Sequence, residues 1–240
     1  MVRIRAQLAK GSEARFISHL DLVRALERAL RRTGLPVAYS EGFNPHPKIA
    51  FASALPLGAT SEAEYFDVIF SEPVLPRQFE LALNEQLPLG LRVIEAREVS
   101  LRGPALMAAI DVSFWEVAFP APPGGRATVA AAIERLLGQG ACVRVHQAKH
   151  GDREIDIRPL IDQIDLVPEG NSPEPAAAER GDGQVRIVMG LAAGARGSVR
   201  PEEVVAALAD LGGFSVERGD IELKRLAMAA GRGTISPWDV

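Results

Sequence analysis

Apolar and polar positions alternate over residues 2–8, where Val, Ile, Ala and Leu are separated by Arg, Arg and Gln. A period of two predicts a β-strand with one buried and one solvated face. From residue 18 the apolar period becomes that of a helix, which we expect to begin after an N-cap at Ser18 and to end at Gly34. Its apolar face should pack on a sheet. The opposite face carries four arginines, Arg24, Arg28, Arg31 and Arg32.

The pattern predicts further elements in the first hundred residues. Strands are expected at residues 37–39, 49–54, 64–70 and 91–99, and a helix at residues 76–87. The resulting order of strand, helix, strands, helix and strand is that of the ferredoxin-like βαββαβ motif.

A weaker version of the same order follows residue 107. Strands are expected at residues 110–119, 142–147, 154–159, 185–190 and 221–228, and helices at residues 127–137 and 201–211. The sequence thus predicts an α+β protein with two tandem ferredoxin-like (βαββαβ) domains, residues 1–103 and 104–240. Each antiparallel sheet should be covered by helices on one face. A stretch rich in Pro, Ala, Glu and Gly near residues 168–183 predicts a disordered surface loop.

Composition limits the class of protein. No stretch approaches the roughly 18 uninterrupted apolar residues of a membrane helix, and the charged first segment is unlike a signal peptide, so no membrane partner is expected. The single cysteine, Cys142, excludes an internal disulfide framework and indicates a reducing compartment, which we take to be the cytoplasm. Residues 1–60 hold nine Lys/Arg against four Asp/Glu, whereas the rest of the chain is acidic. This asymmetry favours a local anionic partner, with ordinary surface variation as the alternative.

The segment from residue 39 to residue 48 combines turn formers with side chains that bind nucleic acids. Two prolines flank a histidine, which makes the backbone stiff. Aromatic, imidazole and amine groups there can stack on bases or pair with phosphates. The candidate RNA-binding or anion-binding residues of this loop are Tyr39, Ser40, Phe43, Asn44, His46 and Lys48. The alternative is a plain β-connection in which Phe43 fills the core.

A second polar cluster precedes the arginine-bearing helix. Ser18 is expected as the cap, with Asp21 as its partner in a capping box, and their backbone amides would make the helix N-terminus an anion site. Arg15 and Ser18 are further candidate RNA-binding or anion-binding residues. His19 lies angularly near the apolar face, so both a packed and a working histidine remain open. If the protein is an enzyme, the catalytic candidates are His19, Asp21 and His46. Neither histidine has the short-spaced partner of a zinc site, so no metal is expected.

The second half of the chain holds one charged pair on an alternating strand, Asp156 and Arg158. Such a pair is commonly a salt bridge, and a functional role is the alternative. No phosphate loop, dinucleotide fingerprint or zinc-protease motif is found, so no cofactor is expected.

Residues 14–68 resemble the signature of a bacterial family of radical-SAM-linked proteins of unknown function, through the motifs FISHLD and YSEGFNPHPKI. The second half resembles it more loosely, chiefly through EIDIRPLI. The resemblance implies a small accessory protein encoded beside, or fused behind, a radical SAM protein. The chain lacks the CxxxCxxC cysteines of a radical SAM cluster, so it is not the radical enzyme itself.

These observations together predict an RNA-binding accessory protein of a radical SAM partner, acting on tRNA or rRNA. The arginines of the helix would contact phosphates, and the loop would position a nucleotide. One alternative is an RNA-processing or RNA-modifying enzyme, although the missing motifs favour a protein without catalytic activity. The other is a protein-interaction module that docks the radical SAM partner through the basic helix.

Overall fold

The structure, a computed structural model, describes residues 1–146, 153–168 and 183–240. The chain forms two compact units, which differ in extent from the two predicted domains. The first unit joins Met1–Ser113 to Lys224–Val240, and the second is Phe114–Leu223. The last strand therefore packs with the beginning of the chain. The predicted surface loop near residues 168–183 lies almost wholly outside the described residues.

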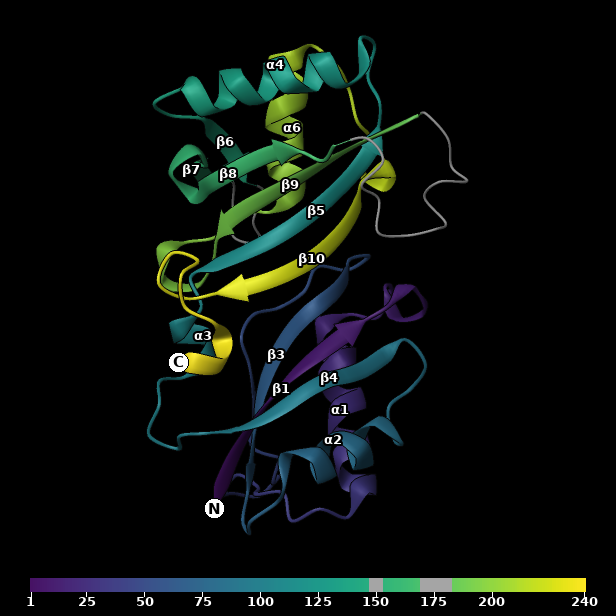
Figure 1. The fold of residues 1–240 in the computed structure, drawn as a ribbon, viewed down its shortest axis with the longest axis vertical. Coiled ribbons are helices and arrows are strands. Elements are labelled where there is room, and N and C mark those ends of the chain that lie inside the picture. Colours follow the sequence, from purple (N-terminus) through teal and green to yellow (C-terminus); the bar gives the residue numbers. More distant parts are fainter. Residues whose placement is uncertain (147–152, 169–182) are drawn as a thin grey trace. The chain divides into compact units, whose positions relative to one another are not determined.

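The first unit is built on a sheet with the strand order β4-β1-β3-β2, in which every neighbouring pair is antiparallel (Figure 1). Its strands are β1 (Val2–Lys10), β2 (Ile49–Phe51), β3 (Thr60–Phe70) and β4 (Leu91–Val99). The predicted strand at residues 37–39 is reduced to isolated bridges. Because β2 pairs with only one end of the long strand β3, the other end is open to β10 (Glu222–Ala229). β10 runs parallel to β3 there, so the expectation of purely antiparallel sheets is wrong.

Helices α1 (His19–Thr33) and α2 (Pro76–Asn84) cover one face of this sheet. The apolar positions of β1, including Ile4 and Leu8, and those of β3, including Phe66 and Phe70, are fully buried beneath them. The spacing of the apolar residues in α1 places five of them on the sheet side, Leu22, Ala25, Leu26, Ala29 and Leu30. The predicted amphipathic helix is confirmed.

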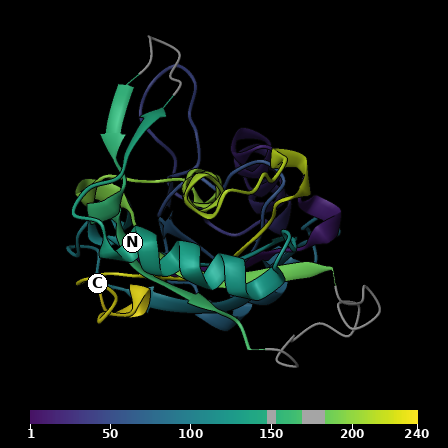
Figure 2. The same ribbon diagram turned by 90° about the horizontal axis from the view of Figure 1, so that it is seen from above.

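The second unit contains the strand order β5-β9-β8. These strands are β5 (Val112–Pro120), which begins at the end of the first unit, β9 (Gln184–Ala192) and β8 (Ile161–Leu166). Helices α4 (Gly125–Gly138) and α6 (Pro201–Gly212) pack against each other. The predicted strand pair forms a separate hairpin, β6 (Val143–His146) and β7 (Arg153–Asp156), which projects from the unit in Figure 2. Within the described residues, no helix combines the length and apolar character needed to cross a lipid bilayer.

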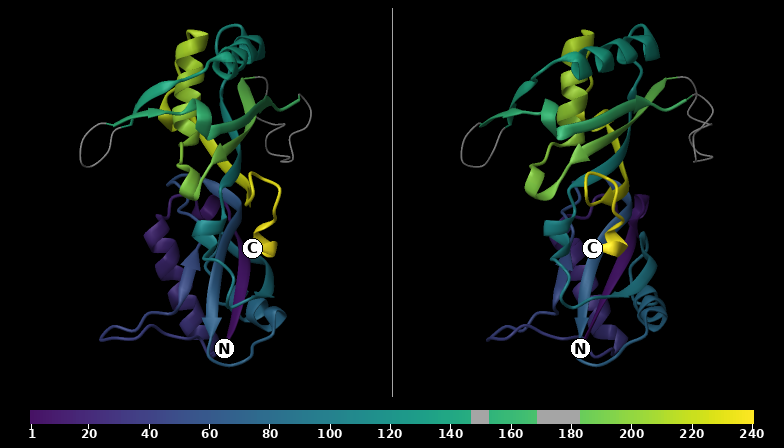
Figure 3. Two further views of the ribbon diagram at one scale, coloured as in Figure 1. Left: turned by 90° about the vertical axis from the view of Figure 1, so that its left-hand side faces the viewer. Right: turned by 60° about the vertical axis from the view of Figure 1, so that its left-hand side comes forward.

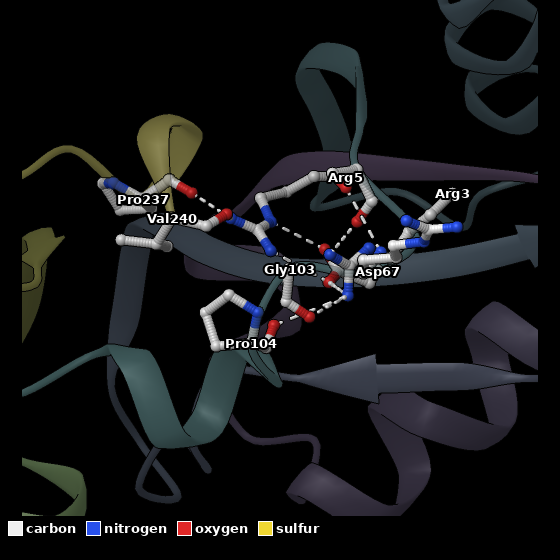
Figure 4. Close-up of polar contacts among 9 residues, drawn as sticks. Arg3, Arg5, Asp67, Gly103, Pro104, Pro237 and Val240 are labelled. Atoms are coloured by element: carbon white, nitrogen blue, oxygen red, sulfur yellow. Dashed lines mark hydrogen bonds and ion pairs between the residues drawn. The ribbon is translucent and has the colours of Figure 1, made fainter.

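The face of the first sheet opposite α1 and α2 is also covered. Helix α3 (Leu106–Ala109) and the segment around Trp238 form a small apolar cluster there with Tyr65. Arg3 and Arg5, expected on a solvated face, are buried, so the prediction of a half-buried strand is wrong. Figure 4 shows the two guanidinium groups directed at Asp67 and at backbone oxygens of Gly103, Pro104, Pro237 and Val240.

Candidate functional site

The first turn of α1 is held by a side-chain cap. The amide of Asp21 donates to the Oγ of Ser18 at 3.2 Å, and the Ser18 hydroxyl donates to the Asp21 carboxylate at 2.8 Å. The predicted cap is confirmed. The Ser18 hydroxyl, and after it Arg24, hold the pKa of the Asp21 carboxyl below its usual range. At the other end, Gly34 adopts a left-handed φ of 67°, which a residue with a Cβ takes up only at a cost.

All four arginines of α1 are exposed, as predicted, but they differ in their partners. Arg32 donates to the side chain and backbone oxygens of Gln86, beyond the end of α2. Arg24 bonds Asp21 at 3.2 Å in an exposed pair that costs little to break. Arg24, Arg28 and Arg31 therefore form the basic stripe that faces solvent.

The predicted binding loop is a closed projection. Tyr39 and Pro47 form an isolated bridge, the Ser40 amide donates to the His46 carbonyl at 2.8 Å, and the His46 amide donates to the Ser40 hydroxyl oxygen at 3.0 Å. Figure 3 shows this loop extending outward beside α1. Its tip is solvent-exposed, including Phe43 and Asn44, as is Lys48 at its base. Phe43 is fully exposed, so the interpretation that it fills the core is wrong.

One contact places the loop beside the basic stripe. The Nδ1 atom of His46 lies 3.7 Å from a carboxylate oxygen of Glu27 on α1. Glu27 is three residues after Arg24 and four before Arg31, so both arginines are its neighbours on the helix surface. The loop and the stripe thus form one continuous surface of the first unit.

His19 lies in a different environment. Its ring packs edge-on against Phe51 at a centroid distance of 5.1 Å, and its buried Nδ1 has no hydrogen-bond partner among the residues that the structure describes. Burial is the main cause that lowers the pKa of His19; Arg225 and Lys10 lower it further, whereas Glu64 raises it.

The structure does not bring the catalytic candidates together. His46 contacts α1 at Glu27, eight residues after His19, which corresponds to about 12 Å along the helix axis. Asp21 is exposed in the first turn and engaged by Ser18. Among the described residues, no group of three or more His, Cys, Asp or Glu side chains is arranged to hold a metal ion.

Sequence reasoning missed the charges beneath His19. The Lys10 amine donates to the carbonyls of Arg15 and Ile17 at 3.1 Å, and to that of Ala59 at 3.3 Å. Arg225 holds both oxygens of Glu64, at 2.8 and 3.0 Å. The alternation of apolar and polar residues could have revealed them, because Lys10 and Glu64 occupy positions of β1 and β3 that face the core.

An exposed apolar cluster lies at the start of α1. Phe16, Leu20 and Leu57 are each about two-thirds exposed or more. The amide of Gly58 donates to the Arg15 carbonyl at 2.9 Å, which holds the backbone beside Leu57 close to the backbone beside Phe16. The Arg15 guanidinium lies 4.8 Å from the centre of the Phe16 ring. Arg15 therefore borders this apolar cluster.

The second unit has a pocket of about 270 Å³ between β6 and the start of α6. Apolar side chains such as Val145 and Val205 share its lining with arginines. Arg144 pairs with Asp210, and Arg218 lies 3.3 Å from Glu202. Two of the three arginines that line the pocket, Arg144 and Arg218, are thus already paired with acidic residues.

Comparison with known families identifies the chain. Residues 3–201 match the family described as "Uncharacterized protein conserved in bacteria (DUF2344)", and the chain belongs to this family. The comparison with curated proteins finds no match.

Proposed function

We propose that this DUF2344 protein binds RNA in the cytoplasm as an accessory protein of a radical SAM partner, to which it presents a tRNA or rRNA. The observation that carries the proposal is the contact between His46 and Glu27, because it sets an exposed aromatic loop beside exposed arginines. Aromatic rings stack on unpaired bases, and guanidinium groups pair with phosphates. The radical SAM partner is proposed on the resemblance of residues 14–68 alone.

The fold supports the helix side of the first unit as the interface. The strand order β4-β1-β3-β2, with α1 and α2 on one face, supports a ferredoxin-like assignment of this unit; a tandem repeat of it in the second unit is part of the proposal. Some RNA-binding domains stack bases on the open face of a four-stranded sheet. Here α3 and the segment around Trp238 occupy that face, which leaves the surface of α1 and the loop for RNA.

The test is the salt dependence of RNA binding. Each phosphate contact on single-stranded RNA contributes a slope of about −0.7 in log affinity against log salt concentration. Three arginines predict a slope near −2, and Arg28→Gln should weaken binding and bring the slope closer to zero by about 0.7. Filter-binding titrations in 50 to 300 mM KCl measure both quantities.

Arg77→Gln is the control, because Arg77 on α2 is, like Arg28, an exposed helical arginine of the first unit. It should leave affinity and slope unchanged. An affinity that does not depend on salt, or an Arg28→Gln slope equal to that of the wild type, would count against the basic stripe as the RNA site.

The exposed apolar cluster favours a second candidate function, a docking module for the radical SAM protein. Aliphatic side chains such as Leu20 and Leu57 gain little from RNA but bury well against a protein. Leu20→Glu should weaken the complex with the purified radical SAM protein at least tenfold in sedimentation velocity. Leu89→Glu, at an exposed leucine elsewhere in the first unit, is the control. Equal complex formation by both variants would exclude this cluster as the docking surface.

A further inference from the structure

The geometry of the loop and the basic stripe favours one class of RNA over others. This inference rests on the proposed RNA binding. We infer that the site takes a short unpaired stretch of RNA, with one base stacked on Phe43 and the adjoining phosphates on Arg24, Arg28 and Arg31. A duplex offers the arginines its phosphates but offers Phe43 no base.

The ring of Phe43 is exposed and therefore available for stacking on a base. Its side chain is fully exposed at the tip of a loop that the Tyr39–Pro47 bridge and the Ser40–His46 hydrogen bonds close. A ring held away from the core presents its faces to a ligand. Bases have free faces only where they are unpaired or splayed out, because a duplex stacks them inside the helix. Phe43 therefore selects single-stranded RNA.

Phe43 lies within a short distance of the arginines of the basic stripe. Phe43 is three residues from His46, so it lies at most about 10 Å along the chain from the contact with Glu27. The basic stripe from Arg24 to Arg31 spans seven residues, about 10.5 Å along α1. The stacking group and the phosphate-binding groups thus fall within reach of neighbouring nucleotides. The combined length of the loop and the basic stripe fits roughly four nucleotides, which is the lower end of the site sizes of single-strand-binding folds.

The loop that carries Phe43 is stiff. Pro45 and Pro47 flank His46, and the hydrogen bonds between Ser40 and His46 tie the two arms of the loop. A loop ordered before binding loses little conformational entropy when a base stacks on it. Stacking on one such ring is worth about a 5- to 150-fold change in affinity.

Fluorescence anisotropy with a labelled 12-nucleotide RNA, as a single strand and as a blunt duplex of the same sequence, tests the inference. The wild type should bind the single strand at least tenfold more tightly than the duplex. Phe43→Ala should abolish this preference and leave duplex binding unchanged, whereas Phe43→Trp should keep the preference. Phe16→Ala, at another exposed phenylalanine, is the matched control and should behave as the wild type.

The outcomes separate this inference from the proposed function. Equal binding of single strand and duplex, with Phe43→Ala unchanged, overturns the single-strand inference and leaves RNA binding standing. The absence of salt-dependent binding to either RNA overturns both. Because Phe43 contributes nothing to the core, a loss of preference in Phe43→Ala at unchanged thermal stability cannot be assigned to unfolding.

Discussion

At the scale of single residues, the chain buries charged groups at positions that alternation assigns to the core. The Lys10 amine has three carbonyl acceptors, and Glu64 holds Arg225 through both oxygens. Buried charges are tolerated when they are paired and hydrogen-bonded, and are costly otherwise. These groups therefore hold the segment before α1 and strand β10 to the sheet.

His19 makes the stability of the protein depend on pH. Burial lowers its pKa in the folded protein from the ordinary value of 6.5. Below that value the unfolded chain binds the proton more readily than the folded one, so the free energy of unfolding should fall as the pH drops from 6.5 towards 5. His19→Gln should show a smaller fall over this range. Urea unfolding at several pH values measures it.

The slope is the diagnostic quantity in this experiment, because any packing loss in His19→Gln shifts the stability at every pH equally. The remaining three histidines are present in both proteins and cancel in the comparison. Identical slopes for the wild type and His19→Gln would show that His19 titrates as it does in the unfolded chain.

Most single residues of the candidate site could be predicted from the sequence. Ser18 as a cap, the exposed stripe on α1 and the closed loop around His46 each follow from short-range pattern and turn chemistry. The contact of His46 with Glu27 did not follow, because it joins a loop and a helix that come together through the tertiary packing of the first unit. Burial of Arg5 was hidden for the same reason: its partner Asp67 is 62 residues away.

At the scale of elements, periodicity located most strands and helices but did not determine their pairing. In the sequence IDQIDL of β8 the first two apolar residues, Ile161 and Ile164, are three apart, which interrupts the alternation of a strand. This strand was therefore missed, although it pairs with β9. The hairpin of β6 and β7 was found but lies outside the larger sheet. Strand pairing depends on packing between distant segments, which local patterns do not contain.

The motif around Asp156 and Arg158 shows how a conspicuous pair can have a local structural role. Asp156 accepts hydrogen bonds from the amides of Cys142 and Arg158, at 2.8 and 3.1 Å. The Arg158 guanidinium donates to the carbonyl of Leu137, near the end of α4, and to that of Ile161 at 3.0 Å. A cation at a helix C-terminus satisfies free carbonyls and the helix dipole. The pair thus ties α4 to the strands that follow it.

At the scale of the whole molecule, the two ends of the described chain share one unit. Arg5 donates to backbone oxygens of Pro237 and Val240, more than 230 residues away, and Trp238 packs against Tyr65. Burial raises the pKa of Tyr65 to about 12, so this phenol stays neutral. The segment around Trp238 therefore closes the sheet face opposite α1, and this closure is one reason for proposing the side of α1 as the RNA-binding side.

Removing the charge of Arg5 should make the C-terminal segment around Trp238 more mobile. Arg5→Met leaves the buried Asp67 without its bidentate partner, which should lower the free energy of unfolding by about 3–5 kcal/mol. It should also speed tryptic cleavage after the exposed Arg232, because Pro237 and Val240 lose their donor. The double variant Arg5→Met/Asp67→Leu should recover part of the stability, since the apolar pair needs no counter-charge, yet keep the faster cleavage. Recovery is incomplete because the buried Arg3 loses its contact with Asp67 and keeps only its backbone acceptors. Wild-type cleavage in both variants would mean that apolar packing around Trp238 alone holds the segment.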